Sequence, residues 1–235
     1  MNRTNRNIIT FPHKPGFGGP GSFQLRITSE LRRRGWKICY AGDKSKTDLI
    51  FIVGSTKKIF WLIAQKLRGK LIVHRLDGRH WHHTILPYPL RIKIRASIIN
   101  LITKFIYYFI SDVIIYQSFF VKKIWNNNQK EFKKEHIIYN SVDTSIYKPV
   151  KRYANDKLKL LSIEGSFPIS NNFINPIITL SGELEERNLI GETILVGKIE
   201  GKMAQIINEQ NLNIKCLGRQ PREAVQKLYK NCIFL

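Results

Sequence analysis

The sequence predicts an α/β protein built from parallel sheets. Short apolar runs alternate along the chain with stretches in which apolar residues recur at helical spacing. Strands and helices that alternate in this way form right-handed βαβ units, whose strands lie parallel. Hydrophobic residues make up 43% of the 235 residues, which is enough for a packed core and argues against wholesale disorder.

The first part of the chain is expected to form a complete α/β domain at residues 1–147. A strand at 7–11 precedes a glycine-rich turn and a helix from about 22 to 34, which Gly35 ends as a C-cap. The elements expected after it are strands at 37–41, 49–53, 70–74, 113–116 and 136–139 and helices at 56–67 and 118–125.

A second domain is expected at residues 148–235, entered through a linker at about 145–156 that contains Pro149 and few apolar residues. Its expected elements are strands at 158–163, 193–196, 214–217 and 232–235 and helices within 177–187, 203–209 and 221–229. A complete doubly wound sheet has about six strands. We therefore expect this second domain to be incomplete and the chain to be a truncation or a fragment.

Positive charge is concentrated in the first part of the chain. Residues 1–150 hold 27 Lys and Arg against 8 Asp and Glu, a net charge of +19, whereas residues 151–235 hold 12 against 9, a net charge of +3. This asymmetry predicts an anionic partner for the first domain, such as a membrane surface, a phosphorylated acceptor or nucleic acid. A solvated basic surface without such a partner is the alternative.

Cysteine usage and the lack of targeting signals favour a cytoplasmic location. Cys39, Cys216 and Cys232 have no CxxC spacing and are interpreted as reduced thiols, without a metal or nucleophile role. The N-terminus lacks the apolar core of a secretory signal, and no uncharged apolar run approaches the ~20 residues that span a bilayer. Peripheral association with the inner face of a membrane remains compatible with these observations.

Two polar segments follow expected strands and are candidate binding sites. The glycine-rich residues 16–22 precede a helix N-terminus, where Gly18, Gly19 and Ser22 can approach a phosphate group. Their spacing matches neither GxGxxG nor the P-loop, and a merely tight turn is the alternative. The second segment, 74–79, lies where the carboxyl ends of parallel strands line a ligand crevice.

Two further segments are open to more than one interpretation. His80, His82 and His83 lack helical metal-ligand spacing, so they favour a mobile polar loop over a metal site. Residues 91–110 alternate basic residues with isoleucine, leucine and aromatic residues. They fit either a core helix with a solvated basic edge or an interfacial helix on anionic lipid.

Residues 140–149, Asn-Ser-Val-Asp-Thr-Ser-Ile-Tyr-Lys-Pro, resemble the Asn-Gly-Val-Asp-x-x-x-Phe-x-Pro segment of retaining GT-B glycosyltransferases of the glycosyl group 1, family 4-like type. Ser141 replaces the usual Gly, and Tyr147 the usual Phe. Three other stretches resemble this family in order and spacing: the glycine loop with its helix ending at 30–35, the strand and helix at 111–123, and residues 216–229.

This resemblance implies two Rossmann-like domains that transfer a sugar from a nucleotide sugar to a glycan or lipid-linked acceptor, with no cofactor and no metal. Asp77 and His74 would be the catalytic residues at the acceptor side of the crevice. The other acceptor-side residues implied are Arg75, Arg79 and Asn140. The donor and its phosphates would be bound by Gly18, Gly19, Ser22, Gly165 and Ser166.

Two departures from the family predict weak or absent transferase activity. Residues 164–172 lack the Arg and Lys that tend to contact the donor diphosphate, and the paired glutamates that hold sugar and ribose would fall after Leu235. The alternative function is a non-catalytic basic α/β module that binds an anionic membrane or nucleic acid. Nucleic acid ranks lower because Trp36, Trp61 and Trp81 do not form a clustered stacking platform.

Overall fold

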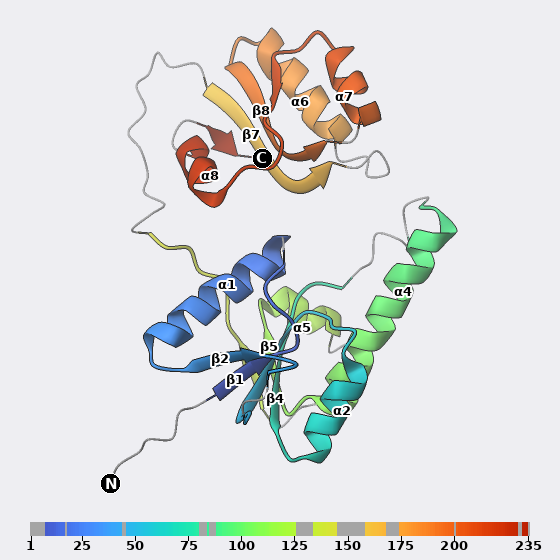
Figure 1. Cartoon of the computed structure of the whole chain (residues 1–235). Coiled ribbons are helices and arrows are strands. Elements are labelled where there is room, and N and C mark those ends of the chain that lie inside the picture. Colours follow the sequence, from blue (N-terminus) through green and yellow to red (C-terminus); the bar gives the residue numbers. More distant parts are fainter. Residues whose placement is uncertain are drawn as a thin grey trace. The chain divides into compact units, whose positions relative to one another are not determined.

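The computed structural model of the chain describes residues 8–16, 18–43, 46–79, 84, 88–125, 134–144, 158–167, 174–199, 201–229 and 232–234. The chain divides into two compact units, Met1–Asn140 and Ser141–Leu235. Each unit contains its own parallel sheet with helices packed against it, which confirms the predicted α/β class (Figure 1). The expected linker, 145–156, lies outside the described residues.

The sheet of the first unit has six parallel strands in the order β2-β1-β3-β4-β5-β6. The strands are β1 (Ile8–Phe11), β2 (Lys37–Tyr40), β3 (Leu49–Val53), β4 (Leu71–Leu76), β5 (Val113–Tyr116) and β6 (Glu135–Ile137). Because β3 and β4 are central and mostly buried, their sequences are almost continuously apolar up to the polar residues that end β4.

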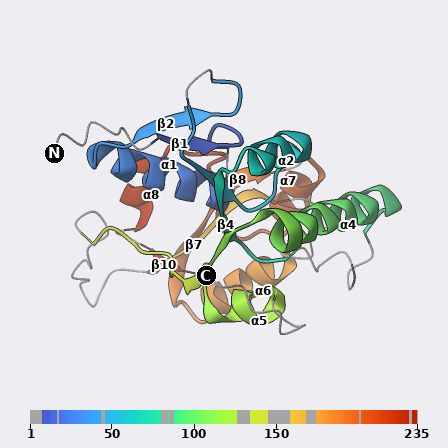
Figure 2. The same ribbon diagram turned by 90° about the horizontal axis from the view of Figure 1, so that it is seen from below.

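Helices cover both faces of this sheet, as the alternation of side chains along β3 requires (Figure 2). Val53 and Phe51 pack on the face covered by α1 (Gly18–Arg33). Ile50 and Ile52 pack on the opposite face, against α2 (Ile59–Leu67) and the π-helix η1 (Ile106–Ile110), which continues α4 (Leu90–Phe105). On that second face, α5 (Phe119–Trp125) packs with η1 beside β4 and β5.

The predicted glycine-rich turn is shorter than expected because α1 begins at Gly18, about four residues early. Gly18 has φ +82, a conformation that favours glycine. A Cβ at Gly21 would lie 1.8 Å from the backbone oxygen of Gly16, so only glycine fits at this close approach of two backbone segments. The glycines therefore form the entry and first turn of the helix.

The sheet of the second unit has four parallel strands in the order β10-β7-β8-β9. Its elements are β7 (Leu158–Phe167), α6 (Ile174–Glu186), β8 (Ile190–Ile199), α7 (Gly201–Asn208), β9 (Ile214–Cys216), α8 (Arg222–Tyr229) and β10 (Ile233–Phe234). Leu195 packs with α6 and α7 on one face, and Ile194 and Val196 pack with α8 on the other. No described helix of either unit is long and apolar enough to cross a membrane.

Candidate functional site

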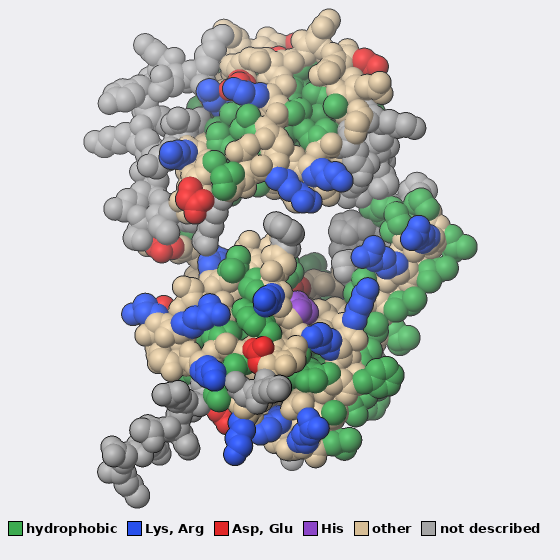
Figure 3. Space-filling view, in the orientation of Figure 1, with side chains coloured by type: hydrophobic (Ala, Val, Ile, Leu, Met, Phe, Trp, Pro, Cys, Tyr) green, Lys and Arg blue, Asp and Glu red, His purple; other side chains and the backbone are tan. Residues whose placement is uncertain are grey.

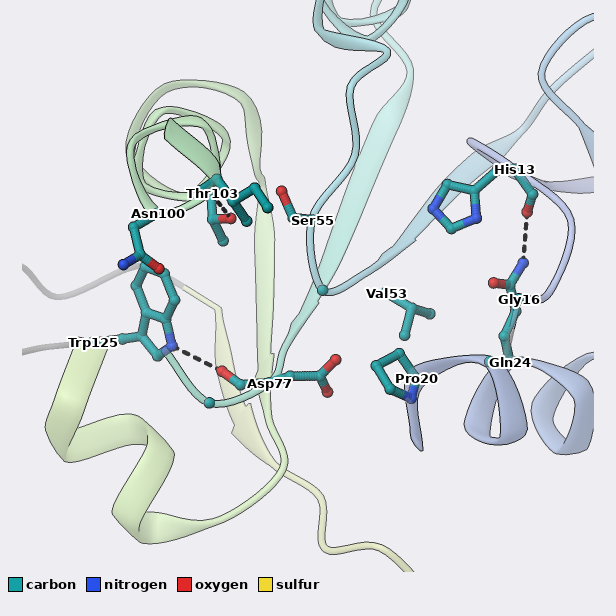
Figure 4. Close-up of a pocket in the computed structure, with 14 residues that line it drawn as sticks. His13, Gly16, Pro20, Gln24, Val53, Ser55, Asp77, Asn100, Thr103 and Trp125 are labelled. Carbon is teal, nitrogen blue, oxygen red and sulfur yellow. Dashed lines mark hydrogen bonds between the residues drawn. The ribbon is translucent and has the colours of Figure 1, made fainter. Parts of the chain in front are cut away.

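The carboxyl ends of β3 and β4, together with the loop after β1, border a cavity of about 300 Å³ in the first unit (Figure 4). Parallel α/β sheets bind ligands at this edge, and the volume lies at the lower end of ordinary ligand pockets. The described lining residues are His13, Gly16, Pro20, Gly21, Gln24, Val53, Gly54, Ser55, Asp77, Gly78, Ile99, Asn100, Thr103 and Trp125. The walls therefore combine an apolar rim with several hydroxyl, amide and carboxylate groups.

Asp77, a predicted catalytic residue, lines this cavity and contacts Arg75 and Trp125. Its Oδ1 forms an ion pair with Arg75, and its backbone oxygen accepts a hydrogen bond of 2.9 Å from the indole Nε1 of Trp125. A Cβ placed on Gly54 would lie 3.0 Å from Oδ2, so glycine leaves room for the carboxylate. Oδ2 itself is buried and has no hydrogen-bond partner in the described part of the chain. It is available to accept a hydrogen bond from a ligand.

Burial raises the pKa of Asp77, and the neighbouring Arg75 guanidinium partly offsets this effect by favouring the charged form. A carboxyl group with a raised pKa in a cleft is a candidate for proton transfer, because its proton affinity lies nearer to that of a hydroxyl nucleophile in the transition state. The position and the electrostatics of Asp77 therefore agree with a chemical role.

Arg75 is buried below this cavity instead of contacting it. Its side chain is 3% exposed, lies 3.8 Å from the ring centroid of Phe23 in α1, and donates to Gln117 Oε1 (3.0 Å) and Asn140 Oδ1 (2.8 Å). With the Asp77 ion pair, these contacts engage both terminal nitrogens of the planar guanidinium. In the structure Arg75 pairs with Asp77, and its acceptor-side role stays a prediction. Asn140 and Arg79 are exposed after β6 and β4 respectively.

His74, the second predicted catalytic residue, is enclosed within the sheet. Its side chain is completely buried, and its Nε2 lies 2.7 Å from the backbone oxygen of Gly54. Burial lowers the pKa of His74 to about 4, so the ring is neutral at pH 7 and Nε2 carries the proton that Gly54 accepts. Because the ring does not line the cavity, direct contact with a substrate is not supported; His74 fixes the turn that borders Asp77.

The glycine-rich segment reaches the cavity through residues adjacent to those predicted. Gly16, Pro20 and Gly21 line it, whereas Gly18, Gly19 and Ser22 are exposed on the first turn of α1. The first backbone N–H groups of a helix have no intrahelical partner and attract anions. The exposed turn is therefore open to a phosphate.

Several polar residues that line the cavity were not predicted from the sequence. Gln24 is buried on α1 and donates from Nε2 to the backbone oxygen of His13 (2.7 Å), which closes the loop after β1. Asn100 and Thr103 are buried polar residues one helical turn apart on α4. A polar pair at this spacing in a largely apolar helix could have been recognised in the sequence as a candidate pair of site residues, because polar side chains are rarely buried without a partner or a function.

In the second unit, Gly165 and Ser166 are exposed near the carboxyl end of β7. Ser166 pairs in register with Lys198 of β8. The backbone N–H of Gly197, next to Lys198, donates to the backbone oxygen of Gly218 (2.8 Å). Arg219 directly follows Gly218 and therefore lies at the same carboxyl edge of the sheet as Lys198. β8 and the loop after β9 thus supply cationic side chains that the sequence of 164–172 lacks. Lys198 was missed because strand register is invisible in a linear motif.

The described residues contain no group of three His, Cys, Asp or Glu side chains that could hold a metal ion. The histidines at 80, 82 and 83 lie outside the described residues. Of the three cysteines, Cys39 and Cys232 are buried as small core residues, whereas Cys216 is exposed.

Neither a protein-family model nor a curated protein sequence matches the chain. Several solved structures do share its fold. The HepE protein of Anabaena in complex with UDP and glucose is 14% identical with a TM-score of 0.56, over 97% of this chain and 73% of that protein. Its complex with UDP-glucose is also 14% identical, with a TM-score of 0.54 over 96% of this chain and 71% of that protein. TarM is 12% identical, with a TM-score of 0.54 over 79% of this chain and 35% of TarM. The chain therefore has a GT-B-like fold with two Rossmann-like parallel sheets.

Proposed function

We propose that this protein transfers a sugar from a nucleotide sugar to an acceptor hydroxyl bound in the first unit. The observation that carries this proposal is the buried, unpartnered Oδ2 of Asp77, which lines a cavity at the carboxyl edge of the sheet. The fold is shared with a protein whose solved complexes contain UDP and UDP-glucose. These two observations are independent, because one concerns a side chain and the other the whole backbone.

In the proposed reaction, the acceptor hydroxyl lies in the cavity and donates a hydrogen bond to Asp77 Oδ2. The acceptor oxygen forms a bond to the anomeric carbon, the bond from that carbon to the diphosphate oxygen breaks, and the nucleoside diphosphate leaves with the electron pair. The hydroxyl proton passes to Asp77. Holding the hydroxyl in place also lowers the entropic part of the barrier. The proposal uses neither a metal ion nor a cofactor.

The donor diphosphate is assigned to the second unit. Ser166 offers a hydroxyl, and Lys198 and Arg219 offer positive charge at one sheet edge. Cations and hydroxyls of this kind stabilise the negative charge that develops on a leaving diphosphate. The first turn of α1, with exposed Gly18, Gly19 and Ser22, is a further candidate for a phosphate contact.

Calorimetry with UDP-, GDP- and ADP-sugars tests donor binding, and release of the nucleoside diphosphate to water as acceptor tests chemistry. We expect Lys198→Gln to weaken donor binding, and Asp77→Asn to preserve donor binding while lowering release by about a hundredfold, the usual cost of one catalytic group. Lys215→Gln, an exposed lysine on β9, is the matched control. Absence of binding to every donor at millimolar concentration would refute the proposal.

A second candidate function is binding to an anionic membrane through α4. Two sides of the helical segment differ, which supports this candidate: Ile102 and Ile106 pack in the core, whereas an apolar stripe of α4 is exposed. This stripe consists of Leu90, Ile94, Ile98, Leu101 and Phe105. It is visible along the outer edge of α4 with basic side chains beside it (Figure 3).

Such a stripe next to Arg91, Lys93, Arg95 and Lys104 has the pattern of an interfacial helix. We expect the protein to co-sediment with vesicles containing anionic lipid and to dissociate at high salt, since each basic residue near the surface contributes about 1 kcal/mol. Leu101→Glu should weaken binding, and Leu189→Glu, at an equally exposed leucine of the second unit, should not. Equal binding to neutral vesicles would contradict the electrostatic part.

A further inference from the structure

A second cavity adjoins the one that contains Asp77. It has a volume of about 650 Å³ and lies between the loop after β3 and α4. Its described lining residues are His13, Ser55, Thr56, Lys57, Lys58, Arg91, Ile94, Arg95, Ile98, Ile99 and Ile102. His13, Ser55 and Ile99 line both cavities, so the two share a wall. We call this second cavity the α4 groove.

The floor of the α4 groove is an apolar track. Ile94, Ile98 and Ile102 recur every four residues along α4 and lie on successive turns. They extend over about 12 Å at 1.5 Å per residue, which suits an extended hydrocarbon chain better than a compact polar group. Ile94 and Ile98 are about half exposed, at 50% and 51%. An apolar ligand would remove this surface from water.

The rim of the groove is cationic. Lys57, Lys58, Arg91 and Arg95 line it, and no Asp or Glu is among its described lining residues. Lys58 Nζ donates to the backbone oxygen of Ala41 (3.2 Å), which leaves its other two protons for a ligand. Arginine and lysine side chains grouped in this way are typical of phosphate binding.

We propose that the α4 groove binds a lipid phosphate and that the acceptor of the transfer reaction is a sugar linked through phosphate to a long-chain lipid. The phosphate meets Arg91, Arg95 and the lysines of the loop, and the hydrocarbon chain lies along the isoleucines. The attached sugar reaches Asp77 across the wall formed by His13 and Ser55. The assignment as acceptor rests on the proposed function. A ligand that is both anionic and apolar uses the rim and the floor together, whereas a free phosphate or a neutral lipid uses only one of them.

Binding of dodecyl phosphate below its micelle concentration, followed by calorimetry on the full chain, tests the groove. Inorganic phosphate provides the anion without the tail, and dodecyl maltoside provides the tail without the anion. We expect dodecyl phosphate to bind at least about tenfold more tightly than either, which corresponds to 1.4 kcal/mol or more. Equal affinity for inorganic phosphate would overturn the lipid assignment, and equal affinity for the maltoside would overturn the phosphate assignment.

Two double variants of α4 with the same loss of charge separate the groove from general electrostatic attraction. R91Q/R95Q removes two groove residues and should lower the affinity for dodecyl phosphate by about tenfold or more. K93Q/K104Q removes two lysines of the same helix that do not line the groove and should leave the affinity within about twofold. Equal weakening by both variants, or none by R91Q/R95Q, would overturn the proposal; circular dichroism confirms that both are folded.

UDP-glucose binding by the same proteins separates this inference from the proposed function. R91Q/R95Q should bind UDP-glucose as the wild type does, because the donor residues are assigned to the second unit. If UDP-glucose fails to bind while dodecyl phosphate binds in the groove, the transfer function and the acceptor role fail and the lipid phosphate site stands. If UDP-glucose binds while dodecyl phosphate does not, the groove proposal alone is overturned.

Discussion

The two units present different polar groups at the carboxyl edges of their sheets. In the first unit the edge is built from buried groups: His74, Arg75 and Gln24 are each at most 3% exposed. They form hydrogen bonds with Gly54, Gln117 and His13 respectively. In the second unit the corresponding groups, Ser166 and Lys198, are exposed. The first edge is therefore fixed in shape before a ligand arrives, whereas the second offers charge that water and salt screen.

The two units also differ in net charge, and the first unit is the more positive. Residues 1–140 hold 26 Lys and Arg against 7 Asp and Glu, and residues 141–235 hold 13 against 10, giving net charges of +19 and +3. A strongly positive unit with a preformed cavity suits an anionic ligand bound by shape and charge together.

The largest effect is expected for Arg75→Leu. The substitution leaves Asp77 partly buried without its ion-pair partner, and Gln117 and Asn140 lose their donor. Breaking a buried pair by removing one partner typically costs about 3–5 kcal/mol. We therefore expect the free energy of unfolding of the first unit, measured by chemical denaturation, to fall by about this amount. Arg79→Leu, at an exposed position two residues after Asp77 in the loop that follows β4, serves as control and should change stability little. An equal loss of stability in both variants would show that the contacts of Arg75 do not stabilise the first unit.

A second test measures how the stability of the first unit depends on pH. All six histidines belong to residues 1–140, so histidine protonation acts on this unit. Burial lowers the pKa of His74 to about 4 from an ordinary value of 6.5, so between these values the unfolded chain binds a proton that the folded chain does not. Stability of the first unit should therefore decrease as the pH falls from 6.5 to 4, by at most about 3 kcal/mol from this residue. The decrease should be smaller in His74→Asn, measured by denaturation at a series of pH values. The same slope in both proteins would assign the loss to other groups.

A matched pair of glycine substitutions tests the entry to α1. Gly21→Ala forces a Cβ to within 1.8 Å of the Gly16 backbone oxygen, so the loop that borders the cavity must shift. We expect a loss of about 1–3 kcal/mol, as for other cases of overpacking. A Cβ at Gly19 meets nothing within 4 Å, so Gly19→Ala should be nearly neutral. Equal thermal midpoints for the two variants would contradict the close approach.

Sequence patterns were sufficient for the strands but not for the site. The isoleucine-rich runs at Leu49–Val53 and Val113–Tyr116 were predicted to the residue, because buried parallel strands are almost continuously apolar. β7 continues to Phe167, beyond the predicted end at residue 163, because pairing with β8 resumes at Ser166 and Phe167 after a register shift at residues 164–165.

The functional roles depended on contacts that are distant in the sequence. Arg75 was placed at the correct sheet edge by its position after an apolar run, but its partners Gln117 and Asn140 lie 42 and 65 residues away. Only the fold shows that these contacts bury the guanidinium. Asp77, two residues further on, was predicted as a site residue because it follows the end of the strand, where side chains of a parallel sheet leave the core.

The smallest expected effect concerns the exposed edge of the second unit. Lys198 pairs in register with Ser166 at the carboxyl end of the sheet, where we assign the donor diphosphate. Because the side chain is exposed, its interaction with a phosphate is screened, and we expect Lys198→Gln to weaken UDP-glucose binding by about tenfold at low salt. The difference between the two proteins should shrink at high ionic strength, since screening removes the contribution of the charge from the wild type as well. Calorimetry at two salt concentrations measures both effects, with Lys215→Gln as the control for loss of a lysine elsewhere on the same sheet. A loss that persists unchanged at high salt would mean that Lys198 is enclosed by the bound donor, and the contrast between a preformed first edge and a solvated second edge would no longer hold.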